Sequence, residues 1–196
     1  MRLAFIINLS GEYNNITNIV YNITKQFSES NIYLSTTTTA DTESQWQNVE
    51  ILCTPCCGNQ DKIDETTENY RIISRNNIHG IKYNSGDPIT QTVNFIKNNY
   101  DLIFILRSDI EIWESSILKY LDAIKQEEVG AVYSDFDDEY LRAFSAIYKI
   151  DTSKIHTILV KTKYIEDCDD MSSLIANVYN KSIIRHIPEN LYSLKK

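Results

Sequence analysis

The sequence lacks several features that would identify whole classes of protein. Its 196 residues include only 5 glycines, 3 prolines and 4 cysteines, which excludes collagen-like, low-complexity and disulfide-rich chains. No apolar run approaches the roughly 20 residues that a membrane-spanning helix needs. The first residues become polar at Asn8, too early for a secretory signal. We therefore expect an intracellular, cytoplasmic protein with no transmembrane segment.

Positive charge is also scarce. The chain carries 19 Lys and Arg against 27 Asp and Glu, a net charge of −8. An acidic chain repels phosphate backbones, so nucleic acid is not an expected partner. The apolar share of 42% and the charged share of 23% are typical of a globular protein. The length predicts one domain over residues 1–196.

The cysteines and histidines do not form a recognisable metal motif. Cys53 and Cys56 have a CxxC spacing, but no second CxxC or paired histidine follows to complete a tetrahedral zinc site. Structural or incidental thiols are therefore favoured over a disulfide or a metal site. The three histidines lie far apart in the sequence, which favours surface or core positions for all of them.

Short apolar runs alternate with longer amphipathic stretches along the chain. Their spacing predicts strands near residues 3–8, 32–35, 49–53, 70–74, 102–106, 129–133 and 157–160, with a loop at 36–48. It predicts helices near 16–27, 88–99, 113–126, 139–148 and 171–180. Asp87 followed by Pro88 indicates a helix start. This alternation is typical of an α/β fold with a mostly parallel central sheet and helices on both faces.

In such sheets, ligands bind beyond the carboxyl ends of the strands, and the most apolar predicted strand runs directly into Arg107-Ser-Asp109-Ile-Glu111. Carboxylates at that position can hold a divalent cation, which in turn can bridge a diphosphate. Asp109 on its own could equally cap the helix predicted from Trp113.

Two further acidic clusters have the same ambiguity. Glu166-Asp167-Cys168-Asp169-Asp170 brings carboxylates together, which raises their pKa and suits a general base. An acidic first helical turn, favoured by the helix dipole, is the alternative. Asp135 and Asp137 follow another predicted strand and could form a solvated turn.

Taken in order, these segments resemble the family 2 glycosyltransferases of the GT-A fold over nearly the whole chain. Tyr13-Asn14 is similar to the Tyr-Asn that opens the family's nucleotide pocket, and Asp41 to the last aspartate of its second-strand loop. Asn94 matches the asparagine of an Ala-Arg-Asn helix, and Asp109 matches the final aspartate of the metal-binding DxD motif. The closing stretch, 187–192, resembles the family's Ile-Pro-x-x-Leu-Tyr, and 166–169 its Glu-Asp-x-Asp.

The resemblance implies an inverting transfer of sugar from a nucleotide-diphosphate sugar to a hydroxyl of a glycan, protein or lipid. It implies Mn²⁺ or Mg²⁺ on Asp109, with Glu111 as a second ligand. Asp167 would be the general base, with Asp169 as the alternative. Tyr13, Asp41, Asn94 and Arg107 would bind the donor. The short length is also similar to that of compact glycosyltransferases encoded by archaeal icosahedral viruses, which would place the protein in a host cytoplasm.

Two departures from the family pattern keep other functions open. Arg107 stands where the first aspartate of the DxD motif belongs, and Thr36 replaces the aspartate that reads the base. Arg107 either pairs with the diphosphate directly or impairs the site. A degenerate module that binds a nucleotide-sugar or glycan without turnover is therefore the alternative function. A nucleotidyltransferase is a second rival, but the segment after the first strand, Leu9-Ser-Gly-Glu-Tyr13, is neither glycine-rich nor basic.

Overall fold

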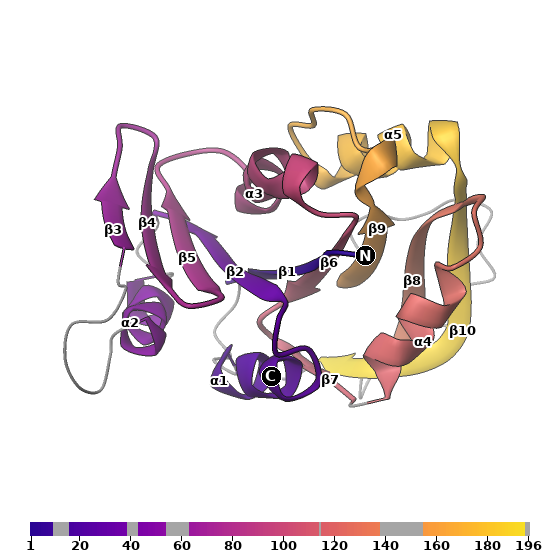
Figure 1. The fold of residues 1–196 in the computed structure, drawn as a ribbon, viewed down its shortest axis with the longest axis horizontal. Coiled ribbons are helices and arrows are strands. Elements are labelled where there is room, and N and C mark those ends of the chain that lie inside the picture. The colour runs from indigo at the N-terminus through magenta and orange to yellow at the C-terminus, as the bar shows by residue number, and fades with distance from the viewer. Residues whose placement is uncertain (10–15, 39–42, 54–62, 114, 138–154, 195–196) are drawn as a thin grey trace.

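The structure, a computed structural model, describes residues 1–9, 16–38, 43–53, 63–113, 115–137 and 155–194. In these ranges the chain forms one ten-stranded sheet with helices on both faces (Figure 1), in the strand order β3-β4-β5-β2-β1-β6-β9-β8-β10-β7. The strands are β1 (Leu3–Asn8), β2 (Asn31–Thr37), β3 (Ile63–Thr66), β4 (Tyr70–Arg75), β5 (Ile78–Tyr83), β6 (Leu102–Arg107), β7 (Ile110–Ile112), β8 (Val129–Asp137), β9 (Thr157–Lys161) and β10 (Ile183–Leu194). The helices are α1 (Ile16–Gln26), α2 (Glu43–Leu52), α3 (Pro88–Ile96), α4 (Ser116–Ala123) and α5 (Met171–Lys181).

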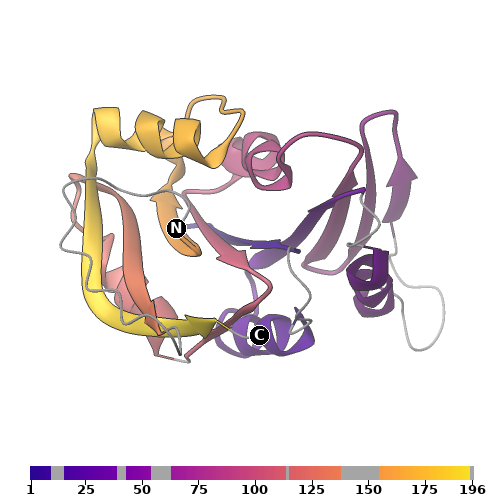
Figure 2. The ribbon, with the colours of Figure 1, turned by 180° about the vertical axis from the view of Figure 1, so that it is seen from behind.

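The centre of the sheet is parallel. β5, β2, β1 and β6 run in one direction, with Phe5 beside Phe104 in the register of β1 and β6. β9 lies antiparallel between β6 and β8, with Leu106 beside Thr157. β10 pairs with β8 and then bends, along the bottom of the view in Figure 2, to pair with β7 at the end of the sheet. We call the side where β1, β2, β5 and β6 end the carboxyl edge, and the opposite side the amino edge.

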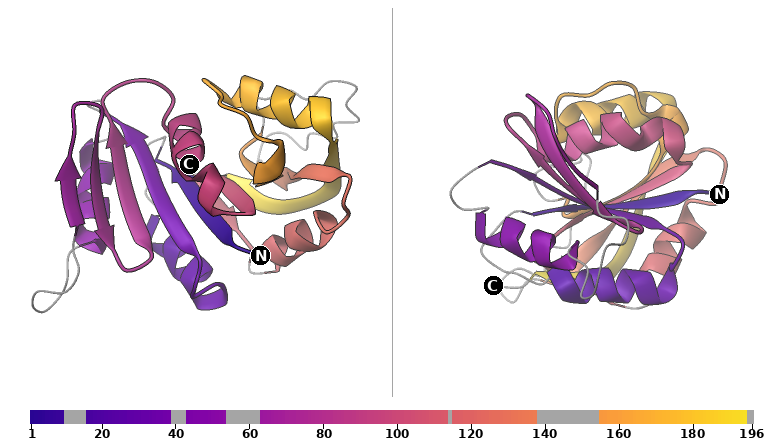
Figure 3. Two further views of the ribbon diagram at one scale, coloured as in Figure 1. Left: turned by 45° about the horizontal axis from the view of Figure 1, so that its top comes forward. Right: turned by 60° about the vertical axis from the view of Figure 1, so that its left-hand side comes forward.

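Two helical layers cover the sheet. Figure 3 shows α3 and α5 on one face and α1 and α2 on the other, and α4 packs on the same face as α1. Successive side chains of a strand point to opposite faces, so Phe104 and Leu106 of β6 pack with α1 and α4. Ile103 and Ile105 pack with α3 and α5. This alternation assigns a face to every side chain at the carboxyl edge.

The structure confirms the predicted fold class and most of the predicted elements. Strands occupy the predicted stretches near 3–8, 32–35, 70–74, 102–106, 129–133 and 157–160, and helices those near 16–27, 88–99 and 171–180. The predicted start of α3 is also confirmed, because the Asp87 carboxylate accepts a hydrogen bond from the Thr90 amide at 3.0 Å.

Three local predictions are wrong. Residues 49–53 are not a strand and 36–48 are not one loop, because Glu43–Leu52 is a helix, α2. Trp46 and Val49 of α2 are buried at a helical spacing that the short apolar run conceals. The helix expected from residue 113 begins at Ser116 with Ser115 as its N-cap, so Asp109 does not cap it. The predicted helix at 139–148 lies outside the described residues.

Four strands, β3, β5, β7 and β10, were not predicted from the sequence. β5 contains His79, Gly80 and Lys82, which interrupt its apolar pattern. A Cβ atom on Gly80 would lie 2.4 Å from Cγ1 of Val49, so glycine allows α2 to pack closely on this strand. Among the described helices, none is long and apolar enough to cross a membrane.

Candidate functional site

Arg107 is the charged residue at the middle of the carboxyl edge. It ends β6, beside Asn8 at the end of β1. Its Nε donates to Oδ1 of Asp109 at 2.9 Å, and its Nη2 donates to Oδ2 at 2.5 Å. The Arg107 side chain is 34% exposed and that of Asp109 14% exposed. The two residues therefore form a bidentate ion pair that is more exposed on the Arg107 side than on the Asp109 side.

His156 contributes the third contact of this guanidinium. Nη1 of Arg107 lies 3.0 Å from Nδ1 of His156, which immediately precedes β9. A guanidinium N–H can only donate, so Nδ1 is the acceptor and a neutral His156 carries its proton on Nε2. Arg107 is thus oriented by a carboxylate on one side and an imidazole on the other.

These side chains lie on the α3–α5 face of the sheet. Arg107 follows Ile103 and Ile105 at two-residue spacing, and both pack with α3 and α5, so strand alternation places Arg107 on that face too. Thr157, next to His156, contacts the opposite side: the Tyr120 hydroxyl lies 2.5 Å from its Oγ1 and 2.6 Å from Oγ of Ser134. This buried hydroxyl cluster fixes the backbone that presents His156.

Tyr192 of β10 packs near His156. Its ring centroid lies 6.3 Å from that of His156, and its side chain is 1% exposed. Burial, reinforced by the nearby Tyr120, raises the pKa of Tyr192 above its usual range. The hydroxyl therefore stays protonated and is not a candidate base at neutral pH.

The residues around Asp109 do not fit a divalent metal ion. Mn²⁺ and Mg²⁺ need several oxygen ligands, and both oxygens of Asp109 already accept hydrogen bonds from Arg107. Glu111, the predicted second ligand, is exposed in β7 between the buried Ile110 and Ile112. Within the described residues, no group of three or more His, Cys, Asp or Glu side chains could hold a metal ion.

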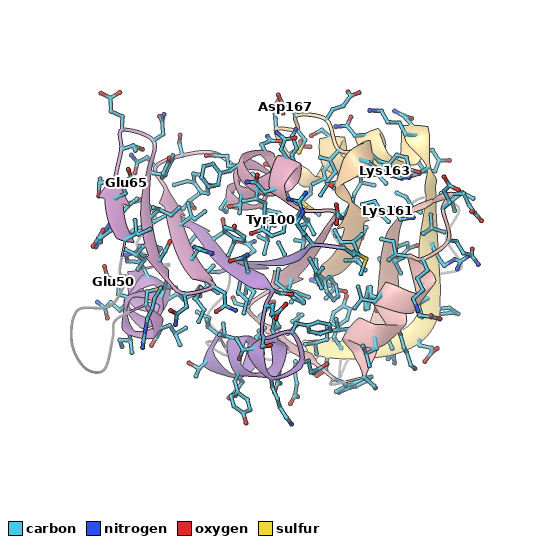
Figure 4. All side chains as sticks on the ribbon, in the orientation of Figure 1. Glu50, Glu65, Tyr100, Lys161, Lys163 and Asp167 are labelled. Carbon is cyan, nitrogen blue, oxygen red and sulfur yellow. The ribbon has the colours of Figure 1, made fainter. Side chains whose placement is uncertain are left out.

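The structure does not bring Asp167 to this site. β9 ends at Lys161, beside Leu102 at the amino end of β6, and the carboxylate of Asp167 accepts a hydrogen bond from Nζ of Lys97, just before β6. Arg107 lies at the other end of β6, a strand about 17 Å long. Figure 4 shows Asp167 on the outside of the helical layer, and its side chain is 91% exposed.

Asp169, the alternative base, lies nearer the carboxyl edge. The segment 167–169 runs antiparallel to α3. Asp167 pairs with Lys97 near the end of the helix, and the carbonyl of Asp169 accepts a hydrogen bond from Thr90 Oγ1 at 3.1 Å near its start. Thr90 is in the first turn of α3, which begins just after β5 reaches the carboxyl edge. Asp169 is therefore nearer the carboxyl edge than Asp167 is, and it lies on the same face of the sheet as Arg107.

The remaining acidic residues of the 166–170 cluster have structural partners. Asp170 is the N-cap of α5, where its carboxylate accepts from the Ser173 amide at 2.7 Å. This hydrogen bond lowers the pKa of Asp170. Glu166 pairs with Nζ of Lys181 at 2.5 Å, which lowers the pKa of Glu166. Asp170 thus caps α5, whereas the first turn of this helix contains no acidic residue, unlike the acidic first turn that the sequence left open.

Asn94, predicted to bind the donor, holds this segment to α3. Its Nδ2 donates to the Cys168 carbonyl at 2.8 Å, and its Oδ1 accepts from the Cys168 amide at 3.3 Å. Burial raises the pKa of the Cys168 thiol to about 11, so the thiol is inert near neutral pH. Asn94 therefore acts in the structure as a backbone clamp.

Some predicted residues lie outside the description. Tyr13 and Asp41 are not among the described residues, and the side chains of Asp135 and Asp137 are not described. His156 was missed as a site residue because its link to Arg107 spans 49 positions in the sequence. The signal that could have indicated His156 was its position just before the strand predicted at 157–160, which pairs with 102–106 in the structure.

Comparisons with known proteins support the fold through structural similarity, not through sequence similarity. No protein-family model and no curated protein matches the chain. Among solved structures, S. aureus TarS 1–349 in complex with UDP-GlcNAc superposes with a TM-score of 0.63 at 12% identity, over 100% of this chain and 59% of that one. The mannosyltransferase PcManGT from Pyrobaculum calidifontis, in complex with GDP-Man and Mn²⁺, gives 0.57 at 11% identity, over 98% and 56%.

These likenesses identify a GT-A fold. The chain spans less than two thirds of both glycosyltransferases. A synthase shares the architecture as well: the 4-diphosphocytidyl-2C-methyl-D-erythritol synthase from Anaerococcus prevotii gives a TM-score of 0.56 at 13% identity, over 96% of this chain and 89% of that one. These comparisons therefore establish the fold alone.

Proposed function

We propose that this protein is a glycosyltransferase that moves a sugar from a nucleotide-diphosphate sugar to an acceptor hydroxyl with inversion. The observation that carries the proposal is that Arg107 ends β6 at the carboxyl edge, while the backbone of Asp169 contacts the first turn of α3 on the same face of the sheet. A cation and a carboxylate on that face match the two charges of the reaction, a diphosphate that leaves and a hydroxyl proton that departs. The GT-A fold supports the same conclusion.

In the proposed reaction, the acceptor oxygen bonds to the anomeric carbon while the bond from that carbon to the diphosphate oxygen breaks. The electron pair of the broken bond leaves with the nucleoside diphosphate, whose added charge is stabilised by N–H donors of Arg107. The hydroxyl proton moves to the carboxylate of Asp169. Asp169 is preferred to Asp167 as the base because it lies on the carboxyl-edge side of the segment.

Two rival functions have specific support. The A. prevotii synthase shares the fold over 89% of its length, which favours a nucleotidyltransferase, although residues 9–13 are neither glycine-rich nor basic. Arg107 in place of a DxD aspartate favours a binding module without turnover.

One assay separates the three functions. The protein is incubated with UDP-, GDP-, ADP-, CDP- and dTDP-sugars, and in parallel with nucleoside triphosphates plus sugar phosphates. A glycosyltransferase releases nucleoside diphosphate from one sugar donor. Release of pyrophosphate from a triphosphate indicates the nucleotidyltransferase. Tight binding of a donor without release of either product indicates the binding module and contradicts the proposal.

A further inference from the structure

We infer that Arg107 holds the diphosphate of the donor directly, with no divalent metal ion on Asp109; this inference rests on the proposed function. The structural neighbours that were solved with Mn²⁺ make a metal the obvious expectation. The geometry around Arg107 points to a different arrangement, in which a permanent organic cation occupies the place of the metal.

Arg107 retains hydrogen-bond donors for a ligand. A guanidinium has five N–H groups, and in the described part of the chain three of them donate, two to Asp109 and one to His156. Two N–H groups remain, on a side chain that is 34% exposed. One of them is on Nη1 and the other on Nη2, so each can donate to an oxygen of a phosphate group. The open side of Arg107 is thus a donor pair at the edge where a GT-A fold binds its nucleotide.

Asp109 is unsuited to bind a metal while this pair exists. Both of its oxygens are bonded to Arg107, at 2.9 and 2.5 Å. A divalent ion on either oxygen would lie within a few ångströms of the guanidinium charge, where two cations repel strongly. Binding a metal would require breaking two charge-assisted hydrogen bonds and moving Arg107 away.

A second pair in the molecule shows what distinguishes Arg107. Arg71 on β4 binds Asp64 in the same bidentate way, at 3.1 and 2.9 Å. Its Nη1 donates to a second carboxylate, Glu50, at 2.9 Å, and these acidic partners raise the pKa of Arg71. Two carboxylates outweigh the single positive charge of Arg71. Arg107 has one carboxylate and a neutral imidazole, so it is better able to attract a diphosphate.

The test is a calorimetric titration of the full chain with UDP and GDP, first in EDTA and then in Mn²⁺. The inference predicts that the nucleotide that binds has the same Kd in both conditions, within about twofold. Binding that requires Mn²⁺ overturns the metal-free inference and leaves the proposed function standing. Failure of both nucleotides to bind in either buffer, together with failure of the donor panel above, overturns both.

Two substitutions with opposite expectations sharpen the test. Arg107→Asp restores two carboxylates, so in EDTA we expect the affinity to fall at least about 10-fold, the loss of a charge-assisted hydrogen bond, and Mn²⁺ to recover it. Asp109→Asn keeps an oxygen for Arg107 and removes a negative charge. Because Asp109 also orients Arg107, we expect the affinity of this variant to change by the same factor in EDTA and in Mn²⁺, whereas the loss of a metal ligand would lower the affinity in Mn²⁺ alone.

Arg71→Asp is the matched control. It breaks an equivalent bidentate pair on β4 and should leave nucleotide affinity unchanged in both buffers. If Arg107→Asp fails to fold by circular dichroism, the Asp109→Asn result decides, because a loss of affinity confined to Mn²⁺ in that folded variant contradicts the inference.

Discussion

Charged side chains lie near both ends of strand β6, but they make different kinds of contact at the two ends. At the amino end, Lys97 binds Asp167 and Asn94 binds the backbone of Cys168. These contacts hold the 166–170 segment against α3. At the carboxyl end, Arg107 is oriented by Asp109 and His156 and keeps two N–H donors for a ligand. The difference shows that charged residues form a candidate binding site only where some of their hydrogen-bonding groups are not already bonded to neighbouring residues.

The largest effect that tests this comparison is on turnover. Asp169→Asn should reduce sugar transfer by about 100-fold or more, the usual contribution of a general base, because Asn cannot accept the hydroxyl proton. Asp167→Asn should change the rate by less than about threefold, since its carboxylate is exposed and lies at the amino end of β6. The measurement is kcat with the identified donor and acceptor.

Nucleotide affinity is the control for both variants and should stay at the wild-type value. If Asp167→Asn abolishes transfer and Asp169→Asn does not, the functional distinction between the two ends of the segment is wrong, and the base is the residue that the family resemblance first indicated.

The next effect is on stability. Asn94→Ala removes two hydrogen bonds to the backbone of Cys168 and should lower the free energy of unfolding by about 1–3 kcal/mol, measured by urea denaturation. The Kd for the nucleotide should not change, because Asn94 belongs to the amino-end contacts. A variant of normal stability that binds nucleotide weakly would instead assign Asn94 to the donor pocket, as the sequence predicted.

A smaller effect concerns pH. His79, whose ring stacks on Tyr33 with the centroids 4.7 Å apart, lies 2.9 Å from Ser74 Oγ and 3.0 Å from Asn31 Oδ1. Burial lowers the pKa of His79 from its ordinary value of 6.5. The unfolded chain therefore binds a proton first as pH falls, so this contribution to stability is present above pH 6.5 and is lost below it.

Thermal unfolding between pH 7.5 and 5.5 measures this loss. His79→Gln has no titrating group and should reduce the pH dependence in that window. Nucleotide affinity at pH 7.5 should be the same in both proteins, because β2 and β5 begin at the amino edge, where His79 lies. An unchanged slope in the variant would assign the pH dependence to other groups.

The sequence predicted the sheet and its edge better than it predicted the site. Continuous apolar strands such as 102–106 and a capped helix start such as Asp87–Pro88 are local signals, and the structure confirms both. The pairing of Arg107 with Asp109 was within reach because only one residue separates them. The link of Arg107 to His156, and the separation of Asp167 from Asp169 along α3, depend on strand order, which no local pattern encodes.

A crystal structure grown with the nucleoside diphosphate and Mn²⁺ together would test the central claim most directly. The account predicts a phosphate oxygen about 2.7–2.9 Å from a guanidinium nitrogen of Arg107. It also predicts that Asp109 remains paired with Arg107, with no anomalous manganese peak between Asp109 and the diphosphate. A manganese ion that bridges Asp109 and the diphosphate, with Arg107 displaced, would contradict it.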